Sequence, residues 1–176
     1  SEGLLRFQRE VQAMASLVHP NVVTVFDIGH DPSTGSGQGG RGGYETRHYL
    51  VLELMEGGDV ERLIASAPNQ RLDAAATARI GKEVARALEH AHSHGLLHRD
   101  VKPGNVWLTK QGSAKLGDFG LAYLGGSPRL TQAGMMVGSI AYMAPEVALG
   151  RQADARSDLY SLGASLYEMA TGRAPF

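Results

Sequence analysis

The sequence has no cysteine, no excess of charge of either sign and no long hydrophobic run. Without cysteine there can be no disulfide, no thiolate metal site and no cysteine nucleophile, a composition that fits a reducing compartment. The 17 basic and 18 acidic residues leave a net charge of -1, so no broad field attracts nucleic acid or anionic lipid. We therefore expect no nucleic-acid partner and only local recognition of charged groups.

The hydrophobic residues are spread through the chain. No uninterrupted apolar stretch approaches the about 18 residues that span a membrane, and the start Ser1-Glu2-Gly3 is not that of a signal peptide. We expect no membrane contact within this segment and a cytoplasmic location, with the cytosolic part of a larger membrane-anchored protein as an open alternative. With 176 residues, 43% of them hydrophobic, the chain is long enough for one packed domain or one large piece of a domain.

The first third of the chain predicts one helix and two strands. Apolar residues recur at three- and four-residue spacing from residue 4 onward, which predicts an amphipathic helix over 4–19 that Pro20 ends. The apolar runs 22–26 and 49–54 predict two strands. Residues 31–43 contain six glycines and almost nothing to bury, so we expect a flexible insertion between two strands of one small sheet.

The rest of the chain predicts two long helices and a hairpin. Asp73 is the expected N-cap of a helix that ends at Gly95. The apolar stripe of that helix comprises Ile80, Val84, Leu88 and Ala91. The apolar runs 105–109 and 114–117 predict a hairpin around Gln111-Gly112. The apolar face of the last helix, which stops at Gly172, comprises Leu159, Leu162, Leu166 and Met169.

Three short motifs follow one another in an informative order. HRDVKPGNV covers residues 98–106, DFG covers 118–120 and APE covers 144–146. In this order and spacing they resemble the catalytic loop, the magnesium loop and the end of the activation segment of protein kinases. Lys102 in the first motif and GSIAYMAPE at 138–146 resemble the serine/threonine branch of this family. The amino-acid pattern of the opening residues resembles bacterial members of this eukaryotic-type family.

The resemblance implies an α+β, two-lobed protein-kinase-like fold. Residues 1–176 would then be a partial kinase domain, with 1–54 as the remaining small lobe and 55–176 as the hinge and the large lobe through its central helix. By similarity to the kinase C helix, Glu10 would pair with the lysine that holds the α- and β-phosphates of ATP. Every lysine of the chain follows Glu10. We therefore expect that lysine, the first strands and the last helices to lie outside this segment, and the segment alone to be inactive.

The same resemblance assigns catalytic and metal-binding roles. Phosphoryl transfer depends mainly on positioning the nucleophile and neutralising the phosphates. Asp100 would accept or orient the proton of the substrate hydroxyl, and Lys102 would lie near the transferring phosphate. Asn105 and Asp118 would hold Mg²⁺, a cation that prefers hard oxygen ligands. ATP and Mg²⁺ are thus the expected cofactors.

The expected nucleotide site draws on the hinge and on the strand after the catalytic loop. LVLELMEGGD at 50–59 resembles the strand and hinge that hold adenine. By this resemblance, Leu52 would be the gatekeeper, and Glu53 and Met55 would bond the adenine edge. Asp59 would contact the ribose, and Trp107 would form the floor under the adenine. Trp107 departs from the family pattern, in which a smaller aliphatic residue is usual at the floor.

The activation loop over 121–143 is expected to be ordered by phosphate. Arg99 precedes the catalytic aspartate, and a guanidinium pairs bidentately with phosphate oxygens. Thr131 is the predicted regulatory phosphosite, with Ser127 as the alternative. Ser139 stands where the serine/threonine branch usually has a threonine facing the acceptor residue.

Several other patterns allow two interpretations. Gly35, Gly37 and Gly40 satisfy a G-x-G-x-x-G pattern, but they follow the expected C helix and precede no strand with a lysine, so we interpret them as composition alone. The histidines at 90, 92 and 94 are interpreted as ordinary helix surface and not as a metal site.

Three further residues have expected structural roles. His98 is expected to pack under Phe119, in a spine that Met14 and Val25 complete. Asp158 is expected to be a buried anchor for the catalytic-loop backbone. Glu146 is expected to lack its usual arginine partner.

The function that these motifs predict is ATP-dependent phosphorylation of serine and threonine hydroxyls on protein substrates. The chain would then belong to a protein serine/threonine kinase, a transferase of phosphoryl groups. The alternative is a non-catalytic pseudokinase or scaffold, against which the presence of Asp100, Asn105 and Asp118 argues. Nothing in the sequence predicts an oligomeric state.

Overall fold

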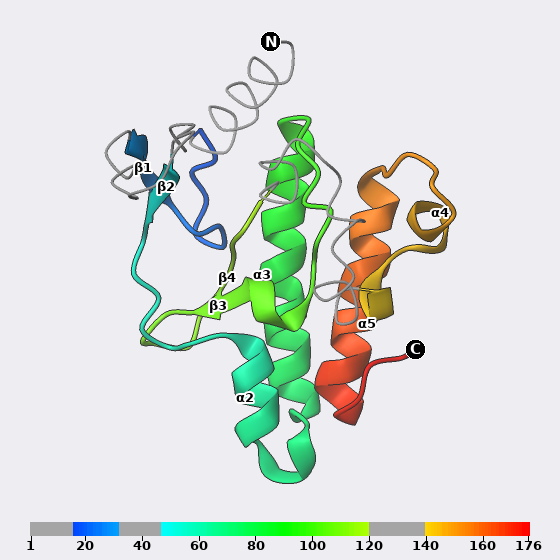
Figure 1. The fold of residues 1–176 in the computed structure, drawn as a ribbon. Coiled ribbons are helices and arrows are strands. Elements are labelled where there is room, and N and C mark those ends of the chain that lie inside the picture. Colours follow the sequence, from blue (N-terminus) through cyan, green and yellow to red (C-terminus); the bar gives the residue numbers. More distant parts are fainter. Residues whose placement is uncertain (1–15, 32–46, 120–139) are drawn as a thin grey trace, which may run out of the picture.

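The computed structural model describes residues 16–31, 47–119 and 140–176 (Figure 1). Most of the predicted opening helix, of the glycine-rich insertion and of the activation loop therefore lies outside the described residues. Residues 16–19 form a turn and coil, so the prediction that the helix runs to Pro20 is wrong for these four positions. Leu17 is buried in the core, which fixes this segment by packing.

A two-stranded antiparallel sheet joins β1 (Val25–Asp31) to β2 (Arg47–Leu52). The prediction of two paired strands is confirmed, but β1 begins three residues later than the apolar run 22–26. The reason is that the start of that run pairs elsewhere. Val22 forms a parallel bridge with Leu116, and Val23 N donates to Leu116 O at 2.9 Å.

The short helix α2 (Val60–Ser66) and the turn η1 (Pro68–Gln70) lead into the long helix α3 (Ala74–Ser93). The Asp73 carboxylate accepts a hydrogen bond from Ala76 N at 2.7 Å, which confirms the predicted N-cap. The predicted apolar stripe is confirmed as well, because Ile80, Val84, Leu88 and Ala91 are all fully buried. Helix α3 thus supplies one wall of the core.

A hairpin of β3 (Val106–Leu108) and β4 (Ala114–Leu116) lies against α3 (Figure 1). The turn between them requires a left-handed residue, and Gly112 has φ of +83°. The turn η2 (Pro103–Asn105) immediately precedes β3. The predicted hairpin is therefore confirmed, and it follows directly on the HRDVKPGN segment.

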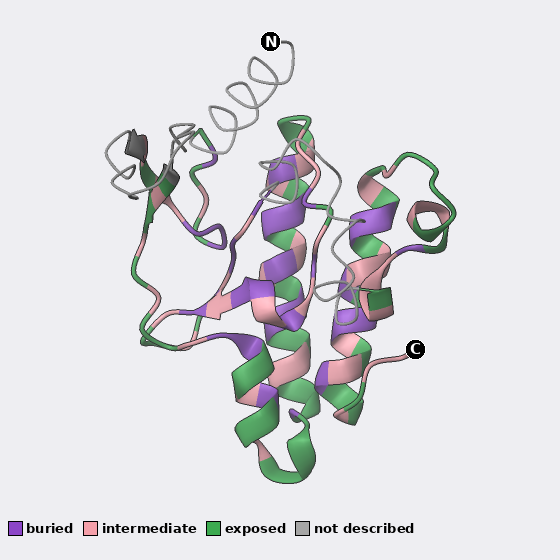
Figure 2. Ribbon diagram, in the orientation of Figure 1, coloured by how far each residue is buried: buried purple, intermediate pink, exposed green. Residues whose placement is uncertain are grey.

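The C-terminal part contains η5 (Ile140–Tyr142), α4 (Pro145–Ala148) and α5 (Ala155–Thr171). Helix α5 packs beside α3, and buried residues lie along both helices (Figure 2). Met169 is fully buried and Leu162 nearly so, but Leu159 is 52% exposed. The prediction is wrong at Leu159, because the buried face at this end of α5 is formed by Ser157 and Asp158. No described helix is long and apolar enough to cross a membrane.

Candidate active site

The HRDVKPGN segment gathers an aspartate, a lysine and an asparagine at one point. Lys102 Nζ lies 2.7 Å from Asp100 Oδ2, and Asn105 Nδ2 donates to the same oxygen at 3.0 Å. Asn105 Nδ2 also donates to the main-chain oxygen of Asp100 at 2.7 Å. These bonds fix one carboxylate oxygen, whereas Oδ1 has no bond to another described residue. The geometry therefore presents one acceptor atom of a positioned carboxylate.

The backbone of this segment is held in an uncommon conformation by one buried carboxylate. Arg99 has φ of +67°, a region that residues other than glycine seldom adopt. The Asp158 carboxylate, 1% exposed, accepts hydrogen bonds from His98 N at 2.9 Å and Arg99 N at 2.8 Å. The predicted anchoring role of Asp158 is confirmed. Two bonds to adjacent amides offset the strain at Arg99.

His92 is a contributor that the sequence interpretation missed. Its Nε2 donates to Asp158 Oδ2 at 2.8 Å, from a side chain that is 17% exposed. The interpretation of all three helix histidines as surface residues is therefore wrong at His92. The missed signal was its spacing from Ile80, Val84 and Leu88, which places it at the edge of the buried stripe. The described residues contain no group of three or more His, Cys, Asp or Glu side chains suited to a metal.

His98 joins the predicted catalytic segment, residues 98–105, to the DFG segment. It is fully buried, and its ring packs edge-on against Phe119 with centroids 4.6 Å apart, as predicted. Asp100 N donates to Nδ1 at 3.2 Å, so the ring proton is on Nε2, which donates to Gly117 O at 2.7 Å. Burial lowers the pKa of His98 below its usual value, although the Gly117 carbonyl and nearby carboxylates act in the opposite direction.

The remaining side-chain oxygens suit a hard cation. Both bonds of the Asn105 side chain use its nitrogen, which leaves the amide oxygen. Asp118 has φ of +58°, and its carboxylate accepts no hydrogen bond from the described residues. Gly117 N donates to Asn105 O at 3.0 Å, which places the segments of the two predicted metal ligands next to each other. Mg²⁺ is commonly held by one or two such side chains together with phosphate and water.

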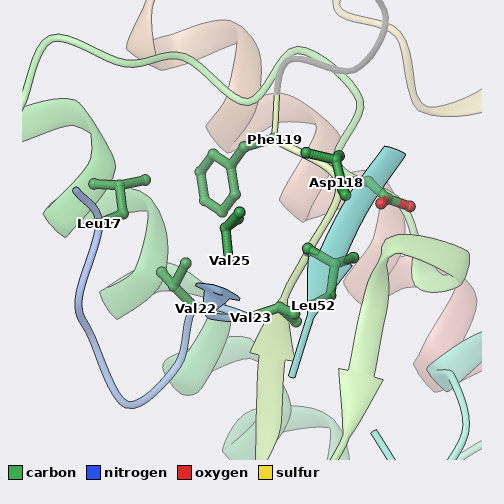
Figure 3. Close-up of a pocket in the computed structure, with 9 residues that line it drawn as sticks. Leu17, Val22, Val23, Val25, Leu52, Asp118 and Phe119 are labelled. Atoms are coloured by element: carbon green, nitrogen blue, oxygen red, sulfur yellow. The ribbon is translucent and has the colours of Figure 1, made fainter. Parts of the chain in front are cut away.

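A pocket lies between the small sheet and the DFG segment (Figure 3). Phe119 and Val25 both point into it, and Leu52, the predicted gatekeeper, forms part of the wall. The complete lining is Leu17, Val22, Val23, Val25, Leu50, Leu52, Gly117, Asp118 and Phe119. The pocket therefore brings the predicted gatekeeper and the predicted metal ligand Asp118 to one cavity.

The predicted hinge is tied to the hairpin by an ion pair. Lys115 Nζ lies 2.6 Å from Oε1 and 2.8 Å from Oε2 of Glu53, and Oε2 also accepts from Thr24 N at 3.2 Å. Desolvation raises the pKa of Glu53, but the bonds from Lys115 and Thr24 outweigh it and hold the pKa below its usual value. The Glu53 amide donates to Thr24 O, which leaves its carbonyl for a ligand. Met55 makes no backbone hydrogen bond to another described residue.

The remaining two predicted nucleotide residues face each other across a backbone bridge. Asp59 and Trp107 are paired, and Asp59 is the N-cap of α2, accepting from Arg62 N at 2.8 Å. Asp59 is therefore a buried capping residue, and its contact with a ribose stays a prediction. Trp107 is half-buried, on the side of the hairpin that also carries Lys115.

One side-chain contact ties the APE segment to α5. Glu146 has a partner, because Ser157 Oγ donates to Glu146 Oε1 at 2.6 Å and lowers the pKa of that carboxyl. Helix α5 thus supplies a hydroxyl as a partner of Glu146, and the expected lack of an arginine partner stays a prediction. The positions predicted for Glu10, Met14, Thr131 and Ser139 lie outside the described residues.

The comparisons with known proteins agree with this geometry. Residues 2–176 match the family profile described as the protein kinase domain. The chain belongs to the protein kinase family. It is 45% identical to the DNA damage-responsive serine/threonine-protein kinase RqkA of Deinococcus radiodurans, over 97% of this chain and 24% of that protein. It is also 45% identical to the serine/threonine-protein kinase PksC of Streptomyces coelicolor, over 97% of this chain and 30% of PksC.

A third relative is the serine/threonine-protein kinase PrkC of Bacillus subtilis, at 35% identity over 100% of this chain and 25% of PrkC. The chain thus spans roughly a quarter to a third of the length of these curated relatives. The predicted family and the kinase-like fold are confirmed, with mixed helices and small sheets. Nothing in the comparisons favours a pseudokinase or scaffold.

Proposed function

We propose that this kinase domain serves the transfer of the γ-phosphoryl group of ATP to serine or threonine hydroxyls of protein substrates. The observation that supports it best is the Asp100, Lys102 and Asn105 cluster. Its bonds hold one Asp100 oxygen and leave Oδ1 for an incoming hydroxyl. A carboxylate so placed can orient the alcohol and accept its proton as the new oxygen–phosphorus bond forms. The relatives' names as serine/threonine-protein kinases support the acceptor class.

Asn105 and Asp118 would hold Mg²⁺, which when bound neutralises phosphate charge. The carbonyl of Glu53 and the backbone of Met55 would bond the adenine edge, beside Leu52 and over Trp107. Asp59 would contact the ribose, and Glu10 would pair with the lysine that grips the phosphates. The absence of cysteine supports a cytoplasmic location.

We also infer that phosphorylation regulates this site. Arg99 directly precedes Asp100, and its amide is fixed by Asp158, so a phosphate bound by its guanidinium would act on the catalytic segment. Thr131 is the proposed acceptor, with Ser127 as the alternative, and Ser139 would face the substrate residue. Phosphopeptide mass spectrometry of active full-length protein that found residue 131 unmodified would contradict the first choice.

The test of the proposed function is the single substitution Asp100→Asn in the full-length protein. It keeps the size of the side chain but removes the carboxylate, so kcat for transfer from Mg·ATP to a generic protein should fall at least about 100-fold. The matched control is Asp73→Asn, because asparagine caps a helix as well as aspartate does. Asp73 lies at the start of α3, away from the catalytic segment. Equal phosphate incorporation by the wild type and Asp100→Asn would overturn the proposal.

A further inference from the structure

Trp107 and Gly117 lie on one side of the hairpin, next to each other. Trp107 is the register partner of Lys115, and Gly117 lies two residues beyond Lys115, so the three positions share a face because side chains alternate along a strand. Lys115 is committed to Glu53. The indole is therefore bordered by a fixed side chain and by a residue that has none.

Gly117 has no side chain because the indole fills the available space. A Cβ atom there would lie 3.0 Å from Cδ1 and 3.2 Å from Nε1 of Trp107, and 3.2 Å from a methyl group of Val23. Ordinary contacts between such atoms are about 3.5 to 4.0 Å. Gly117 does not have a positive φ, so its backbone conformation is open to any residue. Space, and not backbone conformation, therefore opposes a side chain at this position.

Among the neighbours of a side chain at position 117, only the indole of Trp107 has room to move. Both main-chain polar groups of Gly117 are bonded: its N donates to Asn105 O at 3.0 Å, and its O accepts from His98 Nε2 at 2.7 Å. Val23 is held by its bond to Leu116 O. The indole is only half-buried. A side chain at position 117 would therefore push Trp107 outward, toward its exposed side.

We propose that Trp107 and Gly117 are a size-matched pair that sets the depth of the purine-binding surface. The pair determines nucleotide affinity because the proposed function places the adenine ring on the outer side of the indole, and the missing side chain at Gly117 lets the indole lie close to the main chain of that residue. This inference rests on the proposed function, since it assigns the exposed side of Trp107 to the nucleotide. It predicts that a side chain at position 117 is tolerated only when residue 107 is smaller than tryptophan.

A double-mutant cycle tests the pair in the full-length protein. The variants are Gly117→Ala, Trp107→Leu and the double substitution. The measured quantity is the Kd of a non-hydrolysable ATP analogue in the presence of Mg²⁺, determined by isothermal titration calorimetry. Gly117→Ala should weaken binding by about 5- to 20-fold beside Trp107 and by less than about 2-fold beside leucine, which corresponds to a coupling of about 0.5 to 1.8 kcal/mol. Gly163→Ala is the matched control, because a Cβ there meets nothing within 4 Å.

Equal fold-changes for Gly117→Ala in both backgrounds would overturn the pairing. If the single variant Gly117→Ala does not fold but the double variant with Trp107→Leu folds and binds the analogue, the pairing is supported. If neither the single variant Gly117→Ala nor the double variant folds, the result counts against the pairing. Binding is measured without turnover. If the binding cycle shows the coupling but the full-length protein transfers no phosphate, the proposed function is contradicted and the pairing is not.

Discussion

His98 is the residue at which the predicted catalytic segment, the DFG segment and the buried core meet. Its neutral ring accepts a bond from Asp100 N and donates one to Gly117 O. A charged imidazolium has no acceptor nitrogen, so protonation would break the first of these bonds. Its burial against Phe119 disfavours the charge further.

This tautomer gives a prediction about acid stability. The folded-state pKa of His98 lies below its usual value of 6.5, so the unfolded chain binds the proton first. The stabilisation is complete above pH 6.5 and is lost as the pH falls below that value toward the folded-state pKa. We expect the free energy of unfolding, measured with urea between pH 8 and pH 5, to fall on acidification.

The variant His98→Phe should be less stable at pH 8 but should show a shallower loss on acidification. The loss does not vanish, because burial also lowers the pKa of His19. Gln111→Ala serves as the control, since Gln111 is exposed in the hairpin turn and carries no titratable group, and should keep the wild-type slope. An unchanged slope in His98→Phe would contradict the assignment.

At the scale of elements, the C-terminal end of α5 is fixed against the loop before α3. Gly172 caps α5 with φ of +80°, and Leu72 N donates to Met169 O at 2.7 Å. A Cβ at Gly172 would lie 2.5 Å from the main-chain oxygen of Gln70. The cap therefore needs glycine both for its backbone conformation and for the close approach of two segments.

Gly172→Ala should consequently destabilise the protein by more than the usual cost of a left-handed alanine, which is about 1 kcal/mol. Gly150→Ala is the matched control, because Gly150 has φ of +75° and nothing lies within 4 Å of a Cβ there. Thermal unfolding followed by circular dichroism should give a clearly larger fall in Tm for Gly172→Ala. Equal falls would show that the contact with Gln70 relaxes without cost.

At the scale of the whole molecule, the ion pair of Lys115 with Glu53 connects the hinge after β2 to the hairpin. The two side chains are 15% and 26% exposed, so the pair is only partly screened by solvent. Glu53 also binds both backbone groups of Thr24. One side chain thus links residues from three parts of the chain.

A double-mutant cycle of Lys115→Met and Glu53→Gln should give a favourable coupling of about 0.5 to 1 kcal/mol in the free energy of unfolding. The coupling should shrink in 1 M NaCl, because salt screens a partly exposed pair. Arg156 with Asp154 is a comparison pair, exposed on both sides at 86% and 52%, and should give a smaller coupling. No coupling for the first pair at low salt would show that it does not stabilise the hinge.

The sequence by itself determined the features that depend on neighbouring residues. The α3 stripe, its Asp73 cap and the hairpin around Gly112 follow from local periodicity and turn chemistry. The Asp100, Lys102 and Asn105 cluster spans only six positions, so its motif already places the three side chains together. Family resemblance extended this to Asp158 and to the contact of His98 with Phe119.

Only the tertiary structure decided which distant segments meet. His92 reaches Asp158 across 66 residues, and Lys115 reaches Glu53 across 62. Neither periodicity nor local chemistry encodes such partners, because a buried polar group binds whatever donor the packing brings to it. The same reason explains the exposed Leu159, the late start of β1 and the contact of Trp107 with Gly117, each of which follows from where another segment lies.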